Sequence, residues 1–444
     1  MKENMLTGSP ARSLFWFAVP MVLGNLFQQF YNIADSVIVG QFVGENALAA
    51  VGASFSITML FMCFAIGGGI GCSVIISQLL GAQRPREMKT AISTALFSLG
   101  GIGLLFMLLG LAINKPLLHL MGTPELISAD AATYLAIYFY GLVFLFIYNT
   151  VSAIFNALGE SKIPLYFLIF SSLLNIGLDL LFVAKFHMGI AGAAWATLIA
   201  QGISAALALS FLLYRLSKIK TEHFRLFDPQ MLKNMGKVAV PSVLQQSVVS
   251  IGMLLLQVVV NGFGATAVAG YAAATKIDSV AIVPMIAVGN AMSTFTAQNI
   301  GARQPERVKK GYHAALLMAG AIGGAVAFLL LLFGQNCVSA FLDPATSSEA
   351  IDIGTQYLKI VSVFYMFMGF MNVTNGILRG AGDIIRFMFC SLFNLTLRVS
   401  IAFIASTILG IIGIWIATPV SWVAAFIFAF VCYKKGYWKK KSLI

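Results

Sequence analysis

Long apolar runs recur along the whole chain, and they constrain the fold more than any other feature of the sequence. Each is about 20 residues or longer, enough for a helix to cross the roughly 30 Å hydrocarbon core of a bilayer. A membrane β-barrel would show segments of about ten residues that alternate in polarity, and these runs do not alternate. Because 59% of the residues are hydrophobic and only 10% are charged, we predict an all-α membrane protein.

Charged residues and Gly/Pro positions divide the chain into twelve apolar segments, which we predict to be transmembrane helices. The first run is too long for a signal-peptide core, so we expect it to be retained as a span. Five scattered cysteines without a CxxC pair indicate neither a disulfide framework nor a metal site. The expected limits of the helices are 13–41, 48–80, 90–113, 131–158, 163–184, 190–214, 238–262, 267–300, 311–333, 351–378, 385–408 and 410–433.

The distribution of Lys and Arg sets the expected orientation of these helices. If the N-terminus is cytoplasmic, the inside segments hold 23 of the 28 basic residues and the outside loops hold only Lys115 and Lys185. This asymmetry predicts a multi-pass protein of the cell membrane with both termini in the cytoplasm. The net charge of +12 therefore suits anionic lipid headgroups, and we expect no nucleic-acid partner.

The two halves of the sequence are repeats. Residues 78–89 read QLLGAQRPREMK and residues 298–309 read QNIGARQPERVK, and further matches recur at offsets of 220 to 223. Six helices per half is an even number, so the halves enter the membrane from the same side. We predict two parallel six-helix bundles related by a pseudo-two-fold axis along the membrane normal: an N-lobe at 1–214, a cytoplasmic linker at 215–237, a C-lobe at 238–433 and a basic cytoplasmic tail at 434–444.

Repeats of this kind are typical of secondary transporters with a site near the middle of the membrane. The sequence contains no GxxxxGK[ST] motif for ATP. It also lacks a pore ring for a channel and a nucleophile–base pair for an enzyme, so we predict a transporter and no enzyme activity.

Acidic residues in the first half break the repeat. Asp35 aligns with Leu255 or Leu256, and Asp179 aligns with Ala402. A carboxylate in the middle of a span costs on the order of 3 kcal/mol, so a residue kept in one half only indicates function. We expect the second half to have no deep carboxylate, since Asp278 and Asp352 fall nearer the ends of spans.

Asn175 and Asp179 are four residues apart and share one helix face. Together with Asp35 and Thr197 they offer hard oxygen ligands that suit Na⁺, while a pair of buried acids can also share a proton. We therefore predict a cation-coupling site and leave the ion open. The alternative is a structural role, in which Asp35 caps a broken helix or bonds Asn32.

The chain resembles the multidrug and toxic compound extrusion (MATE) transporters over almost its full length. The resemblance rests on the twelve spans, the Gln-x-x-Gly-Ala ends of spans 2 and 8, LRGAGD at 378–383 with FNALGE at 155–160, and the acid in the first span. It implies export of organic cationic or amphipathic small molecules in exchange for Na⁺ or H⁺ by alternating access, with no other cofactor.

In the DinF-like branch of the family, the resemblance places the N-lobe cation site on Asp35, Asn175, Asp179 and Thr197. It adds cavity-lining polar residues: Gln28, Tyr31, Asn149, Gln245 and Gln246. The NorM-like branch has a glutamate on span 7 and an acid on span 10, whereas this sequence has Gln245 and Gln246 on span 7 and no acid between Gln356 and Arg379.

Pro20 in the first span is a candidate hinge, because a proline within a helix permits a bend. We expect the protein to work as a monomer in the lipid bilayer. The alternative is a flippase or exporter of a lipid-linked or amphipathic precursor. Such a flippase should carry more cationic residues within its spans than the Lys276 and Arg398 found here.

Overall fold

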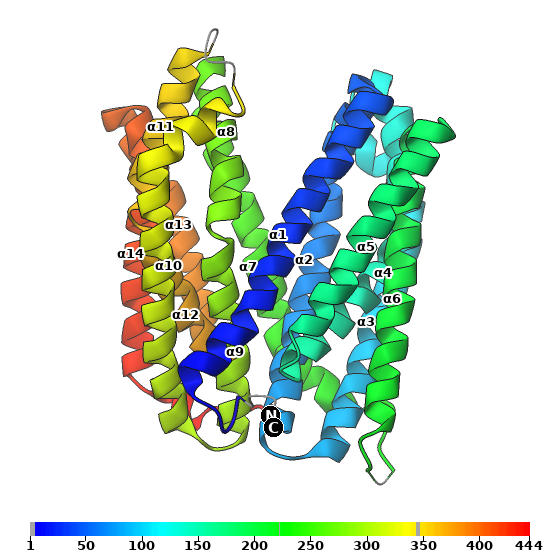
Figure 1. Ribbon diagram of the computed structural model, residues 1–444, viewed down its shortest axis with the longest axis vertical. Helices are drawn as coiled ribbons and strands as arrows, with labels where there is room; N and C mark the ends of the chain where they lie inside the picture. Colours follow the sequence, from blue (N-terminus) through cyan, green and yellow to red (C-terminus); the bar gives the residue numbers. More distant parts are fainter. Residues whose placement is uncertain (1–4, 222, 343–346) are drawn as a thin grey trace. The chain divides into compact units, whose positions relative to one another are not determined.

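The computed structural model of the chain describes residues 5–221, 223–342 and 347–444 (Figure 1). Every regular element within these ranges is a helix, which confirms the all-α prediction. The described chain forms two compact units. We call Leu23–Val243 the N-unit, and the residues up to Val22 together with Leu244–Ile444 the C-unit.

Each predicted segment corresponds to one helix or one pair of consecutive helices, and most helices run a few residues beyond the predicted apolar limits. The helices are α1 (Pro10–Phe42), α2 (Glu45–Gly81), α3 (Pro85–Leu120), α4 (Glu125–Ala157), α5 (Lys162–Asp179) with a π-helix (Leu180–Lys185), α6 (Gly189–Ser217), α7 (Pro229–Asn261), α8 (Ala265–Ala281), α9 (Val283–Gly301), α10 (Pro305–Ser339), α11 (Ser348–Ser362), α12 (Tyr365–Ala381), α13 (Ile384–Leu409), α14 (Ile411–Lys434) and a final short 3₁₀-helix (Tyr437–Lys440).

In the described residues, ten helical segments are long and apolar enough to cross a membrane. The pair α11 and α12, bent by 51°, makes an eleventh if it is one span. The one predicted segment still to be accounted for is the first, which forms α1, a continuous helix of 33 residues. It is not among the ten segments, and Gln28, Gln29, Asn32 and Asp35 interrupt its apolar run.

Within the N-unit, α4 packs against α2, α3 and α6, and α5 packs against α6 (Figure 1). Within the C-unit, α12 packs against α9, α10 and α14, while α13 packs along α14. The unit boundaries fall inside α1 and α7, two residues after Pro20 and Pro241. The lobe limits at 214 and 238 follow the loops instead, and the two six-helix bundles that they define remain a prediction.

The repeat in the sequence reappears in the backbone of the turns. Gly159 and Gly382 have φ angles of 80° and 86°, and Gly189 and Gly410 have φ angles of 61° and 62°. Side chains disfavour this left-handed region, so glycine is the suitable residue where these helices end or begin. The glycines that the two halves share are therefore explained by the same turns in each unit.

Helix packing shows the same correspondence. A Cβ at Gly69 would lie 3.1 Å from Ala153 Cβ and 3.5 Å from the carbonyl oxygen of Asn149, and a Cβ at Gly289 would lie 2.9 Å from the carbonyl oxygen of Asn372. The Asn149 and Asn372 amides both donate to the carbonyl four residues earlier, at 2.9 and 3.0 Å. Both units thus use one small residue and one asparagine to bring two helices together.

Both ends of the described chain belong to the core of the C-unit. Met5 and Trp438 lie in one hydrophobic cluster with Ile300 at the end of α9. Arg307 Nε donates to the Met5 carbonyl at 3.1 Å, and its Nη2 donates to the Gly8 carbonyl. The segment before α1 is therefore anchored to the first turn of α10.

Substitution of Gly289 tests the packing of α9 on α12. We expect Gly289→Ala to lower the stability of the protein by about 1–3 kcal/mol, because the added methyl overlaps the backbone of Asn372. Gly324→Ala in α10 is the matched control, since a Cβ there meets no heavy atom within 4 Å. It should be neutral, or stabilising by up to about 1 kcal/mol through helix propensity. Thermal unfolding in detergent measures both, and equal midpoints would contradict the packing argument.

Candidate functional site

Three helices of the N-unit bring the four predicted coupling residues together. Asp35 comes from the part of α1 that belongs to the N-unit, Asn175 and Asp179 come from α5, and Thr197 comes from α6. The carboxyl groups of Asp35 and Asp179 lie within hydrogen-bond reach of each other. Asn175 and Thr197 lie 3.2 Å apart, between amide and hydroxyl.

The Asn175 amide links the acids to Thr197. In the orientation that satisfies both ends of the amide, its nitrogen donates to Asp179 Oδ2 at 2.7 Å. Its oxygen then accepts from Thr197 Oγ1 at 3.2 Å and from the Thr197 backbone nitrogen at 3.1 Å. A continuous chain of polar contacts therefore runs from α1 through α5 to α6.

The acids occupy an environment that leaves part of their hydrogen-bonding capacity unused. Asp179 is fully buried, at 0% exposure, and Asp35 is half-buried. One oxygen of each, Oδ1, is buried without a partner among the described residues. Two carboxyl groups this close favour a shared proton, and the unpartnered oxygens are free to accept from a further donor or to bind a cation.

The structural alternatives for Asp35 find little support in its surroundings. Asp35 lies inside α1, which continues for seven more residues to Phe42, so it does not cap a helix end. The side chain of Asn32 accepts a hydrogen bond from Gln28 at 3.3 Å, and the Asn32 carbonyl accepts from Ser36 at 2.9 Å. The partner of Asp35 is therefore the acid on α5 and not its own helix.

The backbone of α5 changes form directly after Asp179. The α-helix ends at this residue and a π-helix, Leu180–Lys185, follows. Phe186 N donates to the Leu181 carbonyl at 3.0 Å, five residues earlier. Segments of π-helix are rare and are frequent at functional sites. Here the wider turn ends the regular helix at the buried acid.

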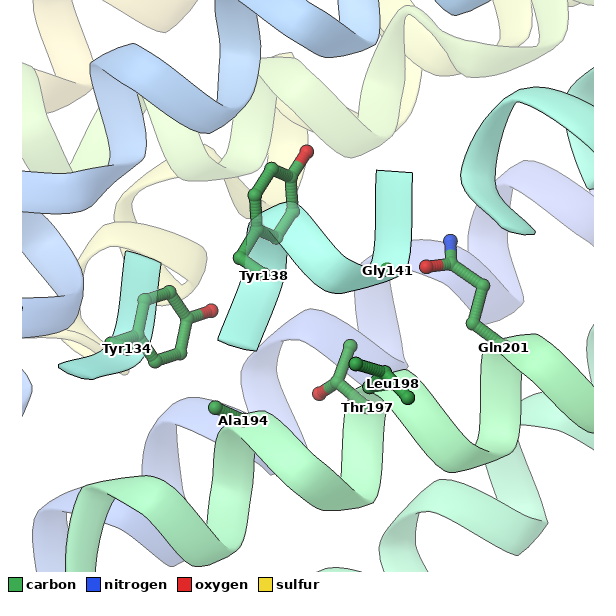
Figure 2. A pocket seen from close by; sticks show the side chains of 7 residues that line it. All are labelled: Tyr134, Tyr138, Gly141, Ala194, Thr197, Leu198 and Gln201. Atoms are coloured by element: carbon green, nitrogen blue, oxygen red, sulfur yellow. The ribbon is translucent and has the colours of Figure 1, made fainter. Parts of the chain in front are cut away.

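Tyrosines complete the surroundings of the acids. Tyr31 on α1 is hydrogen-bonded to Thr197, and both Tyr31 and Tyr134 are within electrostatic reach of Asp35 and Asp179. Tyr134 also lines a small cavity of about 10 Å³, roughly the room that one water molecule needs. Figure 2 shows the Tyr134 hydroxyl pointing toward Thr197 across this cavity, which is lined by Tyr134, Tyr138, Gly141, Ala194, Thr197, Leu198 and Gln201.

Sequence reasoning missed Tyr134 and Gln201. Tyr134 is matched by Tyr357 in the second half, and residues shared by both halves are interpreted as residues needed for the fold. Gln201 lies four residues after Thr197, on the same face of α6, and this spacing is the signal that could have found it.

The other predicted polar residues have local partners or none. Gln28 bonds Asn32, and Asn149 bonds its own helix in the manner of Asn372. Gln245 Oε1 is buried without a partner in the described part of the chain, and Gln246 is half-buried on the same helix. Pro20 lies inside α1 at its C-unit end.

The expectation that the second half has no deep carboxylate is wrong. Asp278 lies near the end of α8 at the join with α9, inside the continuous apolar segment Ala265–Gly301. It accepts a hydrogen bond from the Tyr365 hydroxyl at 2.5 Å and is within electrostatic reach of Arg398. The predicted segment 267–300 already covered α8 and α9, so the error lay in judging the place of Asp278 within that segment and not in the limits of the segment.

Comparisons with known proteins agree with this architecture. The MatE family model matches residues 20–181 and 241–404, one match in each half. The probable multidrug resistance protein YpnP of Bacillus subtilis (strain 168) is 32% identical over 438 residues, covering 98% of this chain and 97% of its own. The probable multidrug resistance protein YoeA of the same organism is 29% identical over 443 residues, covering 97% and 95%.

A solved structure, described as the outward-facing conformation of a multidrug resistance MATE family transporter of the MOP superfamily, is also similar. It superposes with a TM-score of 0.91 at 26% identity and covers 98% of both chains. The matches extend over both repeats and nearly the full length of the relatives, and the chain therefore belongs to the MATE family of multidrug and toxic compound extrusion transporters.

Proposed function

We propose that this MATE transporter exports organic cationic and amphipathic molecules in exchange for a cation that binds at Asp35 and Asp179. The observation that carries the proposal is the close approach of these carboxyl groups, which come from two helices of the N-unit. Asp35 has no counterpart in the second half, so the fold itself does not require the pair.

The geometry favours a proton as the exchanged ion. One proton shared between the two carboxyl groups would hold them together, and its departure would leave two negative charges in contact within a membrane-spanning bundle. That repulsion would push α1 away from α5, so protonation and the position of α1 would be coupled. The amide of Asn175 and the hydroxyl of Thr197 would hold Asp179 in place while α1 moves.

Na⁺ is the second candidate. Asp35 Oδ1 and Asp179 Oδ1 are buried and unpartnered in the described residues, and the Asn175 and Thr197 oxygens lie beside them. A hard cation would displace the shared proton and take these oxygens as ligands. Because both ions would bind the same four residues, they would compete.

The placement of these acids supports a DinF-like cation site rather than the NorM-like one with acids on spans 7 and 10. We further propose a monomeric transporter in the cell membrane with both termini in the cytoplasm. The basic residues of the loops support this orientation.

Removal of either carboxylate should abolish coupling. In proteoliposomes with separately imposed pH and Na⁺ gradients, we expect Asp35→Asn and Asp179→Asn to slow gradient-driven drug transport by about tenfold or more, given the value of a charge-assisted hydrogen bond. Glu125→Gln, on the exposed first turn of α4, removes the same charge and should transport normally. Undiminished transport by Asp35→Asn under either gradient would sink the proposal, and the gradient that drives the wild type identifies the ion.

Thr197 and Thr418 form a matched pair for a second test, since they occupy the same register in the two halves. Thr197→Val removes a hydroxyl that contacts Asn175, and the apparent affinity for the coupling ion should fall about tenfold. Thr418→Val removes the equivalent hydroxyl in the C-unit and should leave the affinity unchanged. Ion titrations of transport rate measure both, and equal losses would assign Thr197 to the fold alone.

Pro20 is proposed as the point at which α1 bends during the cycle. Pro20→Ala should slow transport several-fold while drug affinity in equilibrium binding stays within about twofold, because the substitution restores a backbone hydrogen bond that resists bending. Pro116→Ala, at an exposed proline in α3, is the control and should leave the rate unchanged. Loss of binding without a change in rate would contradict a hinge role.

A further inference from the structure

The C-unit holds a guanidinium group that no residue in the described ranges pairs with. Arg398 lies near the middle of α13, where an arginine costs on the order of 3 kcal/mol on the lenient insertion scale. Its Nε is buried without a hydrogen-bond partner, and no salt bridge joins it to a described carboxylate. A charged side chain kept at this depth is a functional site by default.

The nearest acid is already engaged by other groups. Asp278 lies within electrostatic reach of Arg398 but accepts hydrogen bonds from Tyr365, at 2.5 Å, and from Tyr357. Two phenols thus satisfy the carboxylate and leave the donors of Arg398 free. The negative charge of Asp278 thus lowers the free-energy cost of burying the Arg398 guanidinium, but it does not occupy the hydrogen-bond donors of that group.

A second unpartnered donor belongs to the same cluster. The Trp415 indole is fully buried, and its Nε1 has no hydrogen-bond partner within the described structure. Its ring stacks on Tyr271 with the centroids 5.3 Å apart and meets Tyr357 edge-on at 5.0 Å. Arg398 is within electrostatic reach of both tyrosines. Arg398 and Trp415 therefore both have hydrogen-bond donors without partners beside the Tyr271 and Tyr357 rings. Leaving buried donors unpaired costs free energy, so an acceptor bound here would be stabilising.

The close approach of α7 supplies space for the guanidinium. A Cβ at Gly252 would lie 3.1 Å from Arg398 Nη2 and would overlap the side chain of Leu395. In the repeat, Gly252 aligns with Tyr31 or Asn32 and Arg398 aligns with Asn175. The C-unit therefore places a positive charge in the register where the N-unit has an amide beside its acids.

We propose that Arg398 binds the anionic group of transported molecules, a carboxylate or a phosphate, and so extends the cargo of this transporter from cations to zwitterions and amphipathic anions. This proposal rests on the proposed export function. The anion would accept hydrogen bonds from the Arg398 guanidinium, whereas Asp278 interacts with that group only through electrostatic attraction. A cation is disfavoured in this register because the guanidinium already carries the charge.

Rhodamine B and its ethyl ester are suitable probes, since they share one cationic ring system and differ in a free carboxylate. Binding is measured by fluorescence polarisation with the purified full-length protein in nanodiscs, without any gradient. Arg398→Gln should weaken the binding of rhodamine B by about tenfold to a hundredfold and change the affinity for the ester by less than about twofold. Arg398→Lys should restore part of the affinity, because the charge returns without the planar fork.

Asp278→Asn gives a result of opposite sign that a damaged fold would not give. Loss of the competing negative charge should strengthen rhodamine B binding several-fold and leave the ester unchanged or weaker. Lys276→Gln, on an exposed position of α8, removes one positive charge from the same unit and should change neither probe.

Equal weakening of both probes by Arg398→Gln would show a structural role and overturn the proposal. Unchanged rhodamine B binding in that variant would also overturn it, as would equal effects of Lys276→Gln and Arg398→Gln. Because no gradient is applied, these outcomes are independent of whether the Asp35–Asp179 pair drives transport.

Discussion

The contact between Asp35 and Asp179 is the interaction on which the arrangement of the N-unit site depends. A carboxylate on a membrane-spanning helix must find its partners within the protein, because lipid offers none. Asp35 finds its partner on α5, and Asp179 in turn requires Asn175 and, through it, Thr197 on α6. One polar chain therefore links three helices, and the hydrogen bond from Ser171 on α5 to the Ala200 carbonyl on α6 adds a second polar contact between two of them.

The helices and the repeat were predictable from sequence because both depend on local signals. Apolar length identifies a span, and the glycines shared at offsets of 220 to 223 mark turns with positive φ, such as Gly189 and Gly410. The breaks within spans were not predictable in this way. The bend between α11 and α12, the join at Ile282 and the π-helix after Asp179 interrupt segments that remain apolar throughout, so hydropathy passes over them.

The candidate site was predicted through the failure of the repeat at Asp35, Asn175 and Asp179, and the structure places these residues in one cluster. The same reasoning overlooked Tyr134, because Tyr134 has a counterpart in the second half, Tyr357. Tyr134 nevertheless lies beside the acids. A residue that supports the fold in both halves can therefore also line a site in one of them. Asp278 was misjudged for a different reason, since its partners lie on other helices, Tyr365 on α12 and Arg398 on α13, and the surrounding sequence does not show them.

The two units use equivalent registers with opposite electrostatic results. In the N-unit, Asn175 is neutral and lies beside two acids from two helices, which form the proposed site for a mobile cation. In the C-unit the same register holds Arg398, leucine replaces Asp35 and alanine replaces Asp179, so the positive charge is part of the protein. A mobile cation has no place beside a fixed guanidinium, because like charges in a low dielectric repel strongly. Under the two proposals made above, the exchanged cation binds the half that holds the acid pair, while the anionic group of the cargo binds the half that holds the fixed guanidinium.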